Sequence, residues 1–553
     1  MKTPAEVVPG KVMLVEQTAD LRALIAAELA AGKKKIVIPQ GRYRVQAAPG
    51  GHLLFKDLKD VEIIANHVEL VCTSTVQALD FSQCTNVTLR GLTIDYDPLP
   101  FTQGSITAMA PDKSWTEFEV ATAYPENEFK RRVQIYDPAT GDLRRGDADW
   151  NKTIEALGGH RYRIRKADGY RFQEAKDTEQ VGDILVTNNR FPAGAGGHAV
   201  VLTGCENVRL EDITLYASPC FGFLERDCTG STYLRCKIDR RDPVDDPVKR
   251  DQPRMRSLNA DAFHSKGAGK GPAIIGCTAR FQGDDCVNIN GEYHYSSGSR
   301  GKLMRIAVLG KPKINAGDLV EFLPYVGSRP EDAVALNIEL DPTPITEDEK
   351  TLINKLRLNP EIKTGLLTGK ADWYTLTLDR EIVLPGGSAV CASLRVGNGF
   401  VVKDCDFGHN RSRGILIKAS KGEVTGNRII NSRMAAVLIS PEFWWMEAAS
   451  SSDVVVKGNF IEGCLQTPIQ ILARGGNGQP LAAGAHRNIS IQGNRIIDSA
   501  WPLIRVTSTK GLNIGGNEHP KAPPTWQSVS THGKILEPIE LEQCENVTYS
   551  RKP

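Results

Sequence analysis

Short segments in which apolar and polar residues alternate recur along most of the chain, and each lies beside a corner that contains Asn or Gly. The corners are of two kinds, Cys-x-Asn-Val at Cys84, Cys205 and Cys544, and Gly-Asn at Gly426, Gly458 and Gly493. Alternation predicts half-buried strands, and Asn and Gly supply the left-handed backbone conformations that tight bends need. Because strands this short form no core alone, we expect them to stack as coils of about 20 to 25 residues.

Stacked coils of this kind predict an all-β fold, a right-handed parallel β-helix interrupted by two inserted β-barrel-like domains. The alternative repeat fold is a β-propeller, whose blades need longer and more regular units of about 40 residues. An amphipathic helix with apolar residues at Leu21, Ile25 and Leu29 precedes the first strands, which begin near Ile36. We expect this helix to cover the open apolar end of the first coil.

Two charged segments of about 100 residues each break the repeat pattern, and each is long enough for a small barrel or sandwich. The predicted division is an N-terminal cap with the first coils (1–101), a first insert (102–195), central coils (196–291), a second insert (292–396) and C-terminal coils (397–553). The second insert begins directly after the strand that follows Asp284 and Asp285. We therefore expect it to form one wall of a cleft beside this acidic pair.

Composition limits the classes of partner. The 553 residues carry a formal net charge of +2, too small to indicate binding to nucleic acid or to an anionic membrane. No stretch is long enough to span a bilayer, and the N-terminus lacks the apolar run of a signal peptide. The compartment stays open between an intracellular protein and an exported one whose leader has been removed. The 12 cysteines show no zinc-binding spacing, and we expect them to pack inside the repeat rather than to form disulfides.

Three aspartates are the most informative polar residues. Asp261 is followed about one coil later by Asp284 and Asp285, which come after Gly283 and before an apolar strand. Since adjacent strands lie about 4.8 Å apart, stacking would bring the three carboxylates within a few Å. Carboxylates this close cannot all stay ionised, so one can act as an acid while another activates water, as glycosidic bond cleavage requires. The alternative is that the Asp pair forms a solvated turn.

The candidates for substrate binding are His264, Arg413, Lys418, Trp444, Trp445 and Glu447. The histidine follows Asp261 by three residues and could instead be structural. The two basic residues could bind a sugar hydroxyl or a carboxylate, or could lie on a solvated face. The aromatic residues and the glutamate belong to one loop and suit sugar recognition, because a ring face can stack on a pyranose while a carboxylate holds hydroxyls.

The order Asn259-x-Asp261 followed by Gly283-Asp284-Asp285 is similar to the polygalacturonase-type β-helix glycosidases of glycoside hydrolase family 28, which invert configuration with three aspartates. The chain departs from that pattern at several points. The Asn-Thr-Asp-Gly of the family reads Asn-Ala-Asp-Ala here, and its Gly-His-Gly reads Gly-His-Asn at residues 408–410. Its Arg-Ile-Lys is replaced by Arg413 and Lys418, which lie further apart.

A longer resemblance covers most of the chain and points to glycoside hydrolase family 110, the β-helix exo-α-1,3-galactosidases. Its motifs are Tyr96–Gly104, Asn259–His264, Asp284-Asp285, Arg413–Leu416 and Trp444–Glu447. The resemblance implies inversion at terminal α-galactose without a metal or cofactor, and an exported protein. It also implies that Asp261, Asp284 and Asp285 are the catalytic carboxylates and that Trp445 and Glu447 belong to a sugar subsite.

The main hypothesis is an inverting exo-glycoside hydrolase that releases terminal α-linked galactose from an oligosaccharide or polysaccharide. In it Asp284 protonates the leaving oxygen, and Asp285 with Asp261 deprotonates water. One alternative is a β-helix enzyme that acts on uronic acids, either an exo-polygalacturonase or a lyase. Another is a non-catalytic carbohydrate-binding β-helix. Carbohydrate is the expected partner in each case, and the inserts could also build a homodimer interface.

Overall fold

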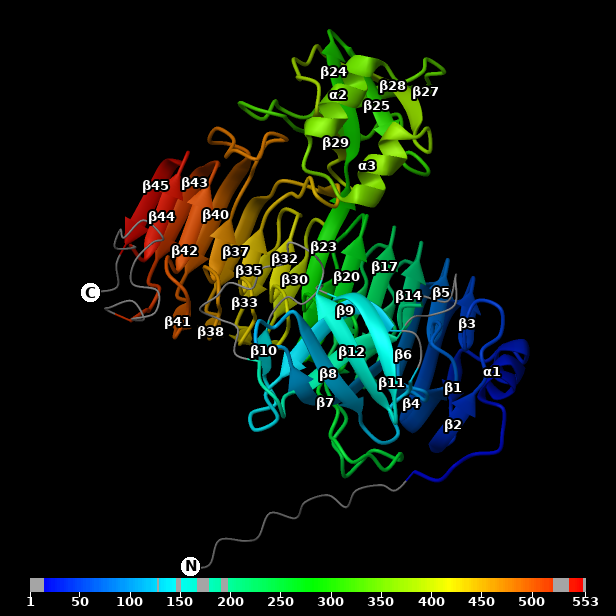
Figure 1. Ribbon diagram of the computed structural model, residues 1–553. Helices are drawn as coiled ribbons and strands as arrows, with labels where there is room; N and C mark the ends of the chain where they lie inside the picture. The colour runs from blue at the N-terminus through cyan, green and yellow to red at the C-terminus, as the bar shows by residue number, and fades with distance from the viewer. Residues whose placement is uncertain are drawn as a thin grey trace, which may run out of the picture.

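The computed structural model describes residues 14–126, 129–145, 151–166, 179–189, 197–520 and 537–550. Their short parallel strands stack into a β-helix whose axis runs from helix α1 (Leu21–Ala30) to strands β44 (Ile539–Glu542) and β45 (Glu545–Ser550), as Figure 1 shows. Parallel strands with crossover connections adopt the right-handed coil. The predicted fold class, a parallel β-helix interrupted by two inserted β domains, is confirmed.

A parallel sheet of 12 strands forms the face of the β-helix that carries the aspartates. Its strands are β3 (Leu53–Lys56), β5 (Leu79–Ser82), β14 (Val200–Thr203), β17 (Phe223–Arg226), β20 (Phe263–Lys266), β23 (Val287–Glu292), β32 (Ile415–Ile417), β35 (Val437–Ile439), β39 (Ile469–Ile471), β42 (Ile504–Thr507) and β44, with β36 (Glu447–Ala448) added antiparallel to the end of β23. Phe263 and Val287 lie in register and point inward, whereas the next pair, His264 and Asn288, points outward. This alternation presents polar side chains on the outer face of the sheet.

The other walls of the β-helix form a sheet of 20 strands. These are β1 (Lys35–Val37), β2 (Gly41–Val45), β4 (Lys59–Cys72), β6 (Thr85–Tyr96), β15 (Arg209–Glu211), β16 (Thr214–Leu215), β18 (Thr232–Leu234), β19 (Lys237–Ile238), β21 (Ala273–Ile275), β22 (Thr278–Arg280), β30 (Val401–Lys403), β31 (Asp406–Gly408), β33 (Glu423–Thr425), β34 (Arg428–Ile430), β37 (Ser452–Lys457), β38 (Phe460–Glu462), β40 (His486–Gln492), β41 (Arg495–Ile497), β43 (Thr509–Gly515) and β45. Most are only two to six residues long, which matches the short alternating segments of the sequence.

The corners behave as the repeats predict. Gly426 and Gly458 both have φ of 65°, in the left-handed region. The Asn that follows each of them is buried and bonds to its counterpart on the next coil, since Asn427 Nδ2 donates to Asn459 Oδ1 at 3.0 Å. Asn459 Nδ2 in turn donates to Asn494 Oδ1 at 2.9 Å. These side-chain ladders satisfy polar groups inside the coil and keep successive corners in register.

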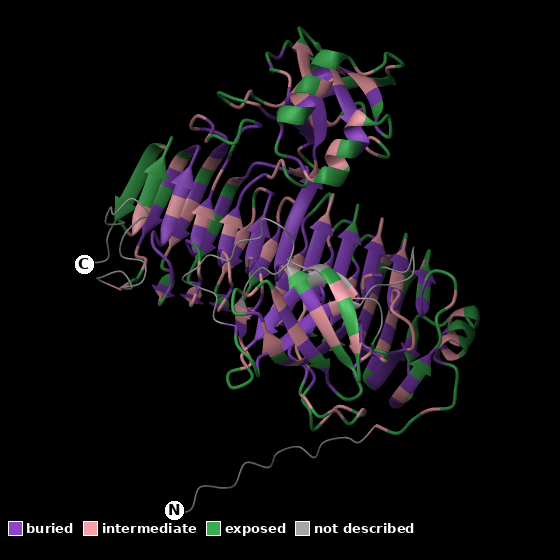
Figure 2. Cartoon of the chain, viewed as in Figure 1, coloured by how far each residue is buried: buried purple, intermediate pink, exposed green. Residues whose placement is uncertain are grey.

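The interior of the β-helix is filled by apolar side chains that stack from coil to coil, and Figure 2 shows the buried residues running along nearly its whole length. Phe223 stacks on Phe263 with ring centroids 5.1 Å apart and planes 8° apart. All 12 cysteines are free, and all but Cys220 and Cys544 are buried. The prediction that they pack as small apolar residues rather than pair as disulfides is confirmed.

Helices are few. The predicted N-terminal helix is α1, capped by the Asp20 side chain, with Leu21 and Ile25 buried. It lies at the end of the first coil, where it was expected (Figure 1). The remaining helices, α2 (Glu347–Lys355) and α3 (Pro360–Leu367), belong to the second insert. In the part of the chain that the structure describes, no helix has the length and apolar character needed to cross a membrane.

The first insert is an antiparallel sheet of seven strands, interspersed with stretches outside the described residues. They are β7 (Phe101–Met109), β8 (Trp115–Val120), β9 (Phe129–Tyr136), β10 (Leu143–Arg145), β11 (Asn151–Gly158), β12 (Arg161–Lys166) and β13 (Ile184–Asn189). The sheet packs on the segment before Asp261, where Gln103 Nε2 donates to the carbonyl of Pro253 at 2.9 Å. It also reaches a later coil, where His409 Nδ1 and Asp142 Oδ1 are 2.6 Å apart.

The second insert closes into a barrel of six antiparallel strands in the order β24-β25-β28-β27-β26-β29. They are β24 (His294–Arg300), β25 (Leu303–Val308), β26 (Leu319–Leu323), β27 (Ala333–Leu340), β28 (Asp372–Leu378) and β29 (Ser388–Ala392). The barrel has an apolar core of its own. Figure 1 shows it standing above the 12-stranded sheet, joined to it through β23.

Candidate active site

Three aspartates meet at the ends of two neighbouring strands of the 12-stranded sheet. Asp261 precedes β20, and Asp284 and Asp285 precede β23 one coil later. One carboxylate oxygen from each lies within 4.8 Å of the others. Gly283 makes this approach possible, because a Cβ atom there would lie 2.5 Å from the carbonyl oxygen of Asn259 on the preceding coil. The structure thus brings together the three carboxylates that the sequence singled out.

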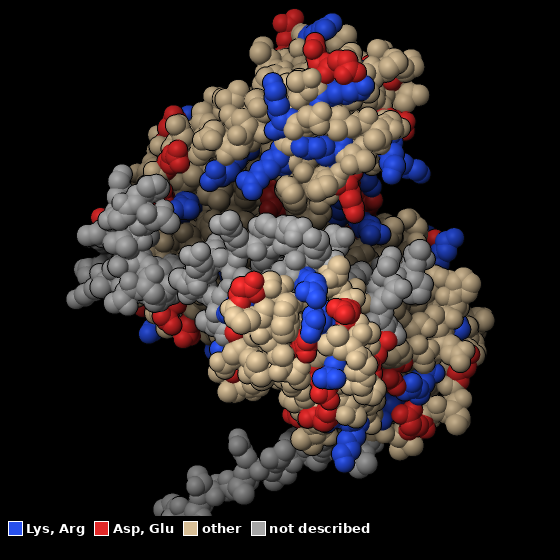
Figure 3. Space-filling model, viewed as in Figure 1, with Lys and Arg blue, Asp and Glu red and all other residues tan. Residues whose placement is uncertain are grey.

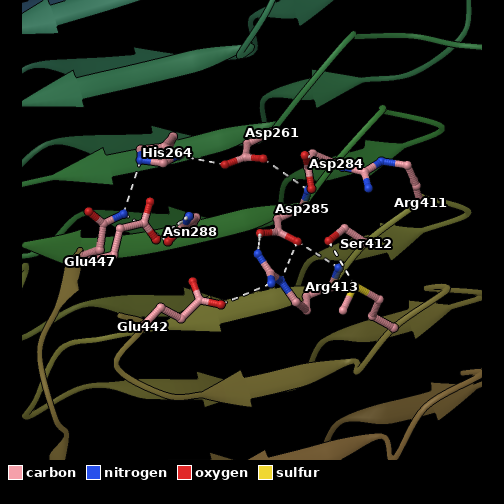
Figure 4. A network of polar contacts seen from close by, with 12 residues as sticks. Asp261, His264, Asp284, Asp285, Asn288, Arg411, Ser412, Arg413, Glu442 and Glu447 are labelled. Carbon is pink, nitrogen blue, oxygen red and sulfur yellow. Dashed lines mark hydrogen bonds and ion pairs between the residues drawn. The ribbon is translucent and has the colours of Figure 1, made fainter. Parts of the chain in front are cut away.

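Asp261 is buried and held by two donors. His264 Nδ1 lies 2.7 Å from Asp261 Oδ2, and the backbone N–H of Asp285 donates to Asp261 Oδ1 at 3.2 Å (Figure 4). Burial, with the nearby charges of Asp285 and Asp284, raises the pKa of Asp261 to about 7, although the bond from His264 opposes the rise. A carboxyl group in this position can hold a proton at neutral pH.

His264 is fixed by its surroundings. Asn290 Nδ2 lies 3.2 Å from His264 Nε2. Because an amide nitrogen can only donate, Nε2 is the acceptor, and the N–H at Nδ1 donates the hydrogen bond to Asp261. Phe221 stacks on the imidazole with centroids 4.5 Å apart and planes 13° apart. These contacts make His264 an orienting partner of Asp261.

Asp285 is the most tightly held of the three carboxylates. The guanidinium group of Arg413 forms a bidentate ion pair with Asp285, at 2.9 Å from Nε to Oδ1 and 2.7 Å from Nη2 to Oδ2. The backbone N–H of Arg413 also donates to Asp285 Oδ1 at 2.8 Å. Bidentate pairing of this kind fixes the geometry of a carboxylate as well as placing a positive charge against it. Asp285 is therefore the most firmly positioned member of the cluster.

Asp284 lies on the accessible side of the cluster. Its side chain is 23% exposed, against 6% for Asp261 and 1% for Asp285. Arg411 contacts its carboxylate and donates from Nε to the carbonyl of Gly283 at 2.6 Å. Among the three carboxyl groups, Asp284 has the most room to meet a ligand.

Lys418 lies beside the cluster, fully buried between two glutamates. Its Nζ is 3.2 Å from Glu442 Oε2 and 2.8 Å from Glu447 Oε2. Burial alone would raise the pKa of Glu447, but Lys418, together with His264 and Arg413, more than offsets it and lowers the value to about 2. Glu447 is thus a charged hydrogen-bond acceptor at any physiological pH.

Trp444 and Trp445 lie in the loop between these glutamates and are 41% and 48% exposed. Backbone hydrogen bonds of 3.0 Å in both directions between Glu442 and Glu447 close the loop. The loop also contacts the second insert, since the backbone N–H of Asn359, the N-cap of α3, donates to the carbonyl of Trp444 at 2.8 Å. Trp445 lines a pocket that extends from the loop to the barrel, which makes it the better placed of the two rings to contact a ligand.

The structure adds residues that the sequence analysis did not single out, namely Phe221, Asn288, Asn290, Arg411 and Glu442. Three of these had a signal in the sequence. Asn288 and Asn290 occupy outward positions of the strand after Asp285, and Glu442 begins the same loop that ends in Glu447. The other two had none, because Phe221 and Arg411 reach the site only through the stacking of coils.

Carboxylates outnumber cations in the site. It contains five carboxylates, on Asp261, Asp284, Asp285, Glu442 and Glu447, and three cations, on Arg411, Arg413 and Lys418. Each cation is within ion-pair distance of at least one of these carboxylates. The site therefore offers a ligand charged acceptors and a proton donor.

No protein-family model matches the chain. A protein of Bacteroides thetaiotaomicron named alpha-1,3-galactosidase B is 22% identical over 540 residues, which cover 90% of this chain and 79% of that protein. Among solved structures, the A-module of mannuronan C-5 epimerase AlgE4 from Azotobacter vinelandii is 12% identical and aligns over 96% of this chain and 92% of that one, with a TM-score of 0.36. Endo-xylogalacturonan hydrolase from Aspergillus tubingensis is 10% identical over 96% of this chain and 95% of that one, with a TM-score of 0.38.

TM-scores of this size carry no inference about activity. The sequence relative is the informative match, because the similarity covers nine-tenths of this chain and about four-fifths of that protein. Similarity over nine-tenths of the chain thus confirms the resemblance that the motifs indicate, to the β-helix α-1,3-galactosidases of glycoside hydrolase family 110.

Proposed function

We propose that the protein is an inverting exo-glycoside hydrolase that releases terminal α-1,3-linked galactose from oligosaccharides or polysaccharides. The observation that carries the proposal is the meeting of Asp261, Asp284 and Asp285 within 4.8 Å in unlike environments. Glycosidases need one protonated and one ionised carboxyl group. Burial and neighbouring charge raise the pKa of Asp261 to about 7, while the guanidinium group of Arg413 pairs with Asp285.

We assign Asp284 as the acid that protonates the leaving oxygen, because it is the most exposed of the three carboxyl groups. In the free enzyme the shared proton resides on Asp261. Its transfer to Asp284 within the cluster leaves Asp261 and Asp285 ionised, and these two then deprotonate the attacking water. The proton belongs to the coupled cluster rather than to one residue.

The stereochemical outcome needs its own test. The oxygens of the three carboxylates lie closer together than the roughly 6.5 to 9.5 Å that separates most inverting pairs. Inversion therefore requires the attacking water to lie beside Asp261 and Asp285 rather than directly between the acid and the base. The assignment of an inverting mechanism rests on the family resemblance. NMR of the first product decides it: β-galactose released from an α-galactoside is expected, and α-galactose would assign a retaining mechanism.

A neutral sugar suits the site better than a uronic acid. Binding a uronate carboxylate requires a cation, yet Arg413 is engaged by Asp285 and Lys418 by both glutamates. The ionised Glu447 can accept hydrogen bonds from sugar hydroxyls, and the exposed face of Trp445 can pack against the C–H groups of a pyranose. These contacts favour a galactoside over the uronic acid substrates of the alternative hypothesis.

Hydrolysis of a panel of aryl glycosides and α-1,3-galactosyl oligosaccharides tests the proposal. We expect galactose release by the wild type and a loss of at least about 1,000-fold in kcat for Asp284→Asn, because an amide supplies no acid. Asp453→Asn, an exposed position on a β-helix corner, is the matched control and should retain activity. No turnover of any α-galactoside, or wild-type rates in D284N, would refute the assignment.

A further inference from the structure

A second pocket lies beyond the aspartates, where the β-helix meets the closed barrel, and has a cavity volume of about 140 Å³. Its charged lining residues are Arg226, Asp227, Lys266, Glu292, Lys313 and Arg395. Four cations against two carboxylates leave this pocket with a formal charge of +2, equal to the net charge of the entire chain.

Part of this charge holds the barrel on the β-helix. Lys313 Nζ of the barrel lies 2.8 Å from Asp227 Oδ2 of the β-helix, and Lys266 Nζ lies 3.3 Å from Glu292 Oε2. These two pairs account for both carboxylates of the pocket. Two guanidinium groups then remain for a ligand, those of Arg226 and Arg395.

The two arginines are weakly engaged. Within the described part of the chain Arg226 makes no ion pair, and its side chain is exposed. Arg395 makes one ion pair, at 3.4 Å from Nη2 to Asp318 Oδ1, and stays 44% exposed. Paired guanidinium groups facing a concave surface recognise planar or tetrahedral oxyanions through charge-assisted hydrogen bonds.

This pocket adjoins the pocket that contains Trp445, because Lys266 and Glu292 line both. Lys266 follows His264 by two residues on β20, so both side chains leave the same face of the sheet. At about 3.3 Å per residue, the five residues from Asp261 to Lys266 span at most roughly 16 Å. A short oligosaccharide can therefore reach both sites at once.

The charge along this path changes sign. Carboxylates outnumber cations around the aspartates, whereas cations outnumber carboxylates in the second pocket. Figure 3 shows Lys and Arg side chains along the rim of a hollow beneath the barrel, with acidic side chains at its floor. An anionic group of a substrate would therefore be accommodated better in the second pocket than beside the aspartates.

We propose that the pocket lined by Arg226 and Arg395 is a subsite for an anionic substituent, a sulfate ester or a carboxylate, on a sugar that remains after the terminal galactose is released. The inference rests on the proposed function, since it names the substrate class of the same site. It gives the enzyme a preference for acidic galactose-terminated glycans over neutral ones.

Calorimetric binding to the D284N protein tests this subsite without turnover. The probes are three trisaccharides that end in α-1,3-linked galactose: a neutral one, one with a sulfate ester on its reducing-end sugar, and one with a uronic acid there. We expect at least one charged probe to bind roughly fivefold to tenfold more tightly than the neutral one. The two charged probes separate sulfate from carboxylate recognition, and the advantage should shrink with added salt.

The variants then locate the effect. Arg226→Ala with Arg395→Ala in the D284N protein should reduce the ratio of charged to neutral affinity to about one. Arg428→Ala is the matched control, because Arg428 is 52% exposed and makes a comparable 3.3 Å ion pair on another face of the β-helix. Equal affinity for all three probes, or an advantage that survives the double substitution, would overturn the subsite. Failure of the wild type to hydrolyse the neutral trisaccharide would instead count against the proposed function.

Discussion

The high pKa of Asp261 predicts that this residue destabilises the protein at neutral and alkaline pH. In the folded chain its pKa is about 7, against 3.8 for an ordinary aspartate, because of burial and the carboxylates of Asp285 and Asp284. The folded state therefore keeps a proton between about pH 4 and pH 7 that the unfolded chain has lost. Stability falls as pH rises through this window, and above pH 7 the full penalty applies. Asp261→Asn removes the charge and should remove the penalty.

The magnitude follows from the shift. About three pKa units at 1.36 kcal/mol each set an upper limit of about 4 kcal/mol. Both partners of the carboxylate, His264 Nδ1–H and the backbone N–H of Asp285, are hydrogen-bond donors. The NH2 group of an asparagine would therefore face one of these donors, unless His264 shifts its proton to Nε2. We therefore expect a net gain of about 2 to 4 kcal/mol. With an unfolding entropy of about 2.1 cal/mol/K per residue over 553 residues, this raises the melting temperature by about 2 to 3 °C.

The assay is thermal unfolding of the wild type and D261N at pH 4 and pH 8, with D453N as the control for substitution of an exposed aspartate. D261N should melt higher at pH 8, should lose most of this advantage at pH 4 and should have little activity. Identical melting temperatures at pH 8, or the same gain at both pH values, would contradict the reasoning. A residue that lowers stability while serving chemistry is expected at an active site.

Three further predictions follow from the site. The kcat/KM of the wild type should fall above about pH 7 as the cluster loses its proton. His264→Phe keeps the stacking on Phe221 but removes the donor to Asp261, so the alkaline limb of the pH profile of kcat/KM should move up by about one pH unit. An unchanged limb in H264F would refute the role of that hydrogen bond. Lys418→Met leaves the partly buried Glu447 without its cation and Glu442 with Arg413 alone, and should destabilise the protein by about 3 to 5 kcal/mol. Urea unfolding measures this loss against K421M, which replaces an exposed lysine, and equal stabilities would contradict the pairing. Trp445→Ala should raise KM about tenfold and Trp444→Ala less, since only Trp445 lines the pocket that extends to the barrel; equal effects in steady-state kinetics would reverse that assignment.

Much of the fold and part of the site could be predicted from the sequence because a β-helix is a local structure repeated. Alternation and Asn or Gly corners are properties of a few consecutive residues, and they predicted the coils and the terminal helix at Leu21. The three aspartates could be predicted for the same reason, because one coil separates Asp261 from the Asp284–Asp285 pair and coils stack in register.

Only the tertiary structure decided the contacts between residues that are separated in sequence by the second insert or by several coils. Arg413 meets Asp285 across 128 residues, and burial together with the nearby carboxylates raises the pKa of Asp261; neither follows from a local pattern. The pairing of Lys418 with two glutamates and the basic pocket under the barrel likewise depend on which coil follows the insert. Sequence spacing measures distance along one coil, whereas pKa values and charge balance depend on burial and on neighbours from other coils.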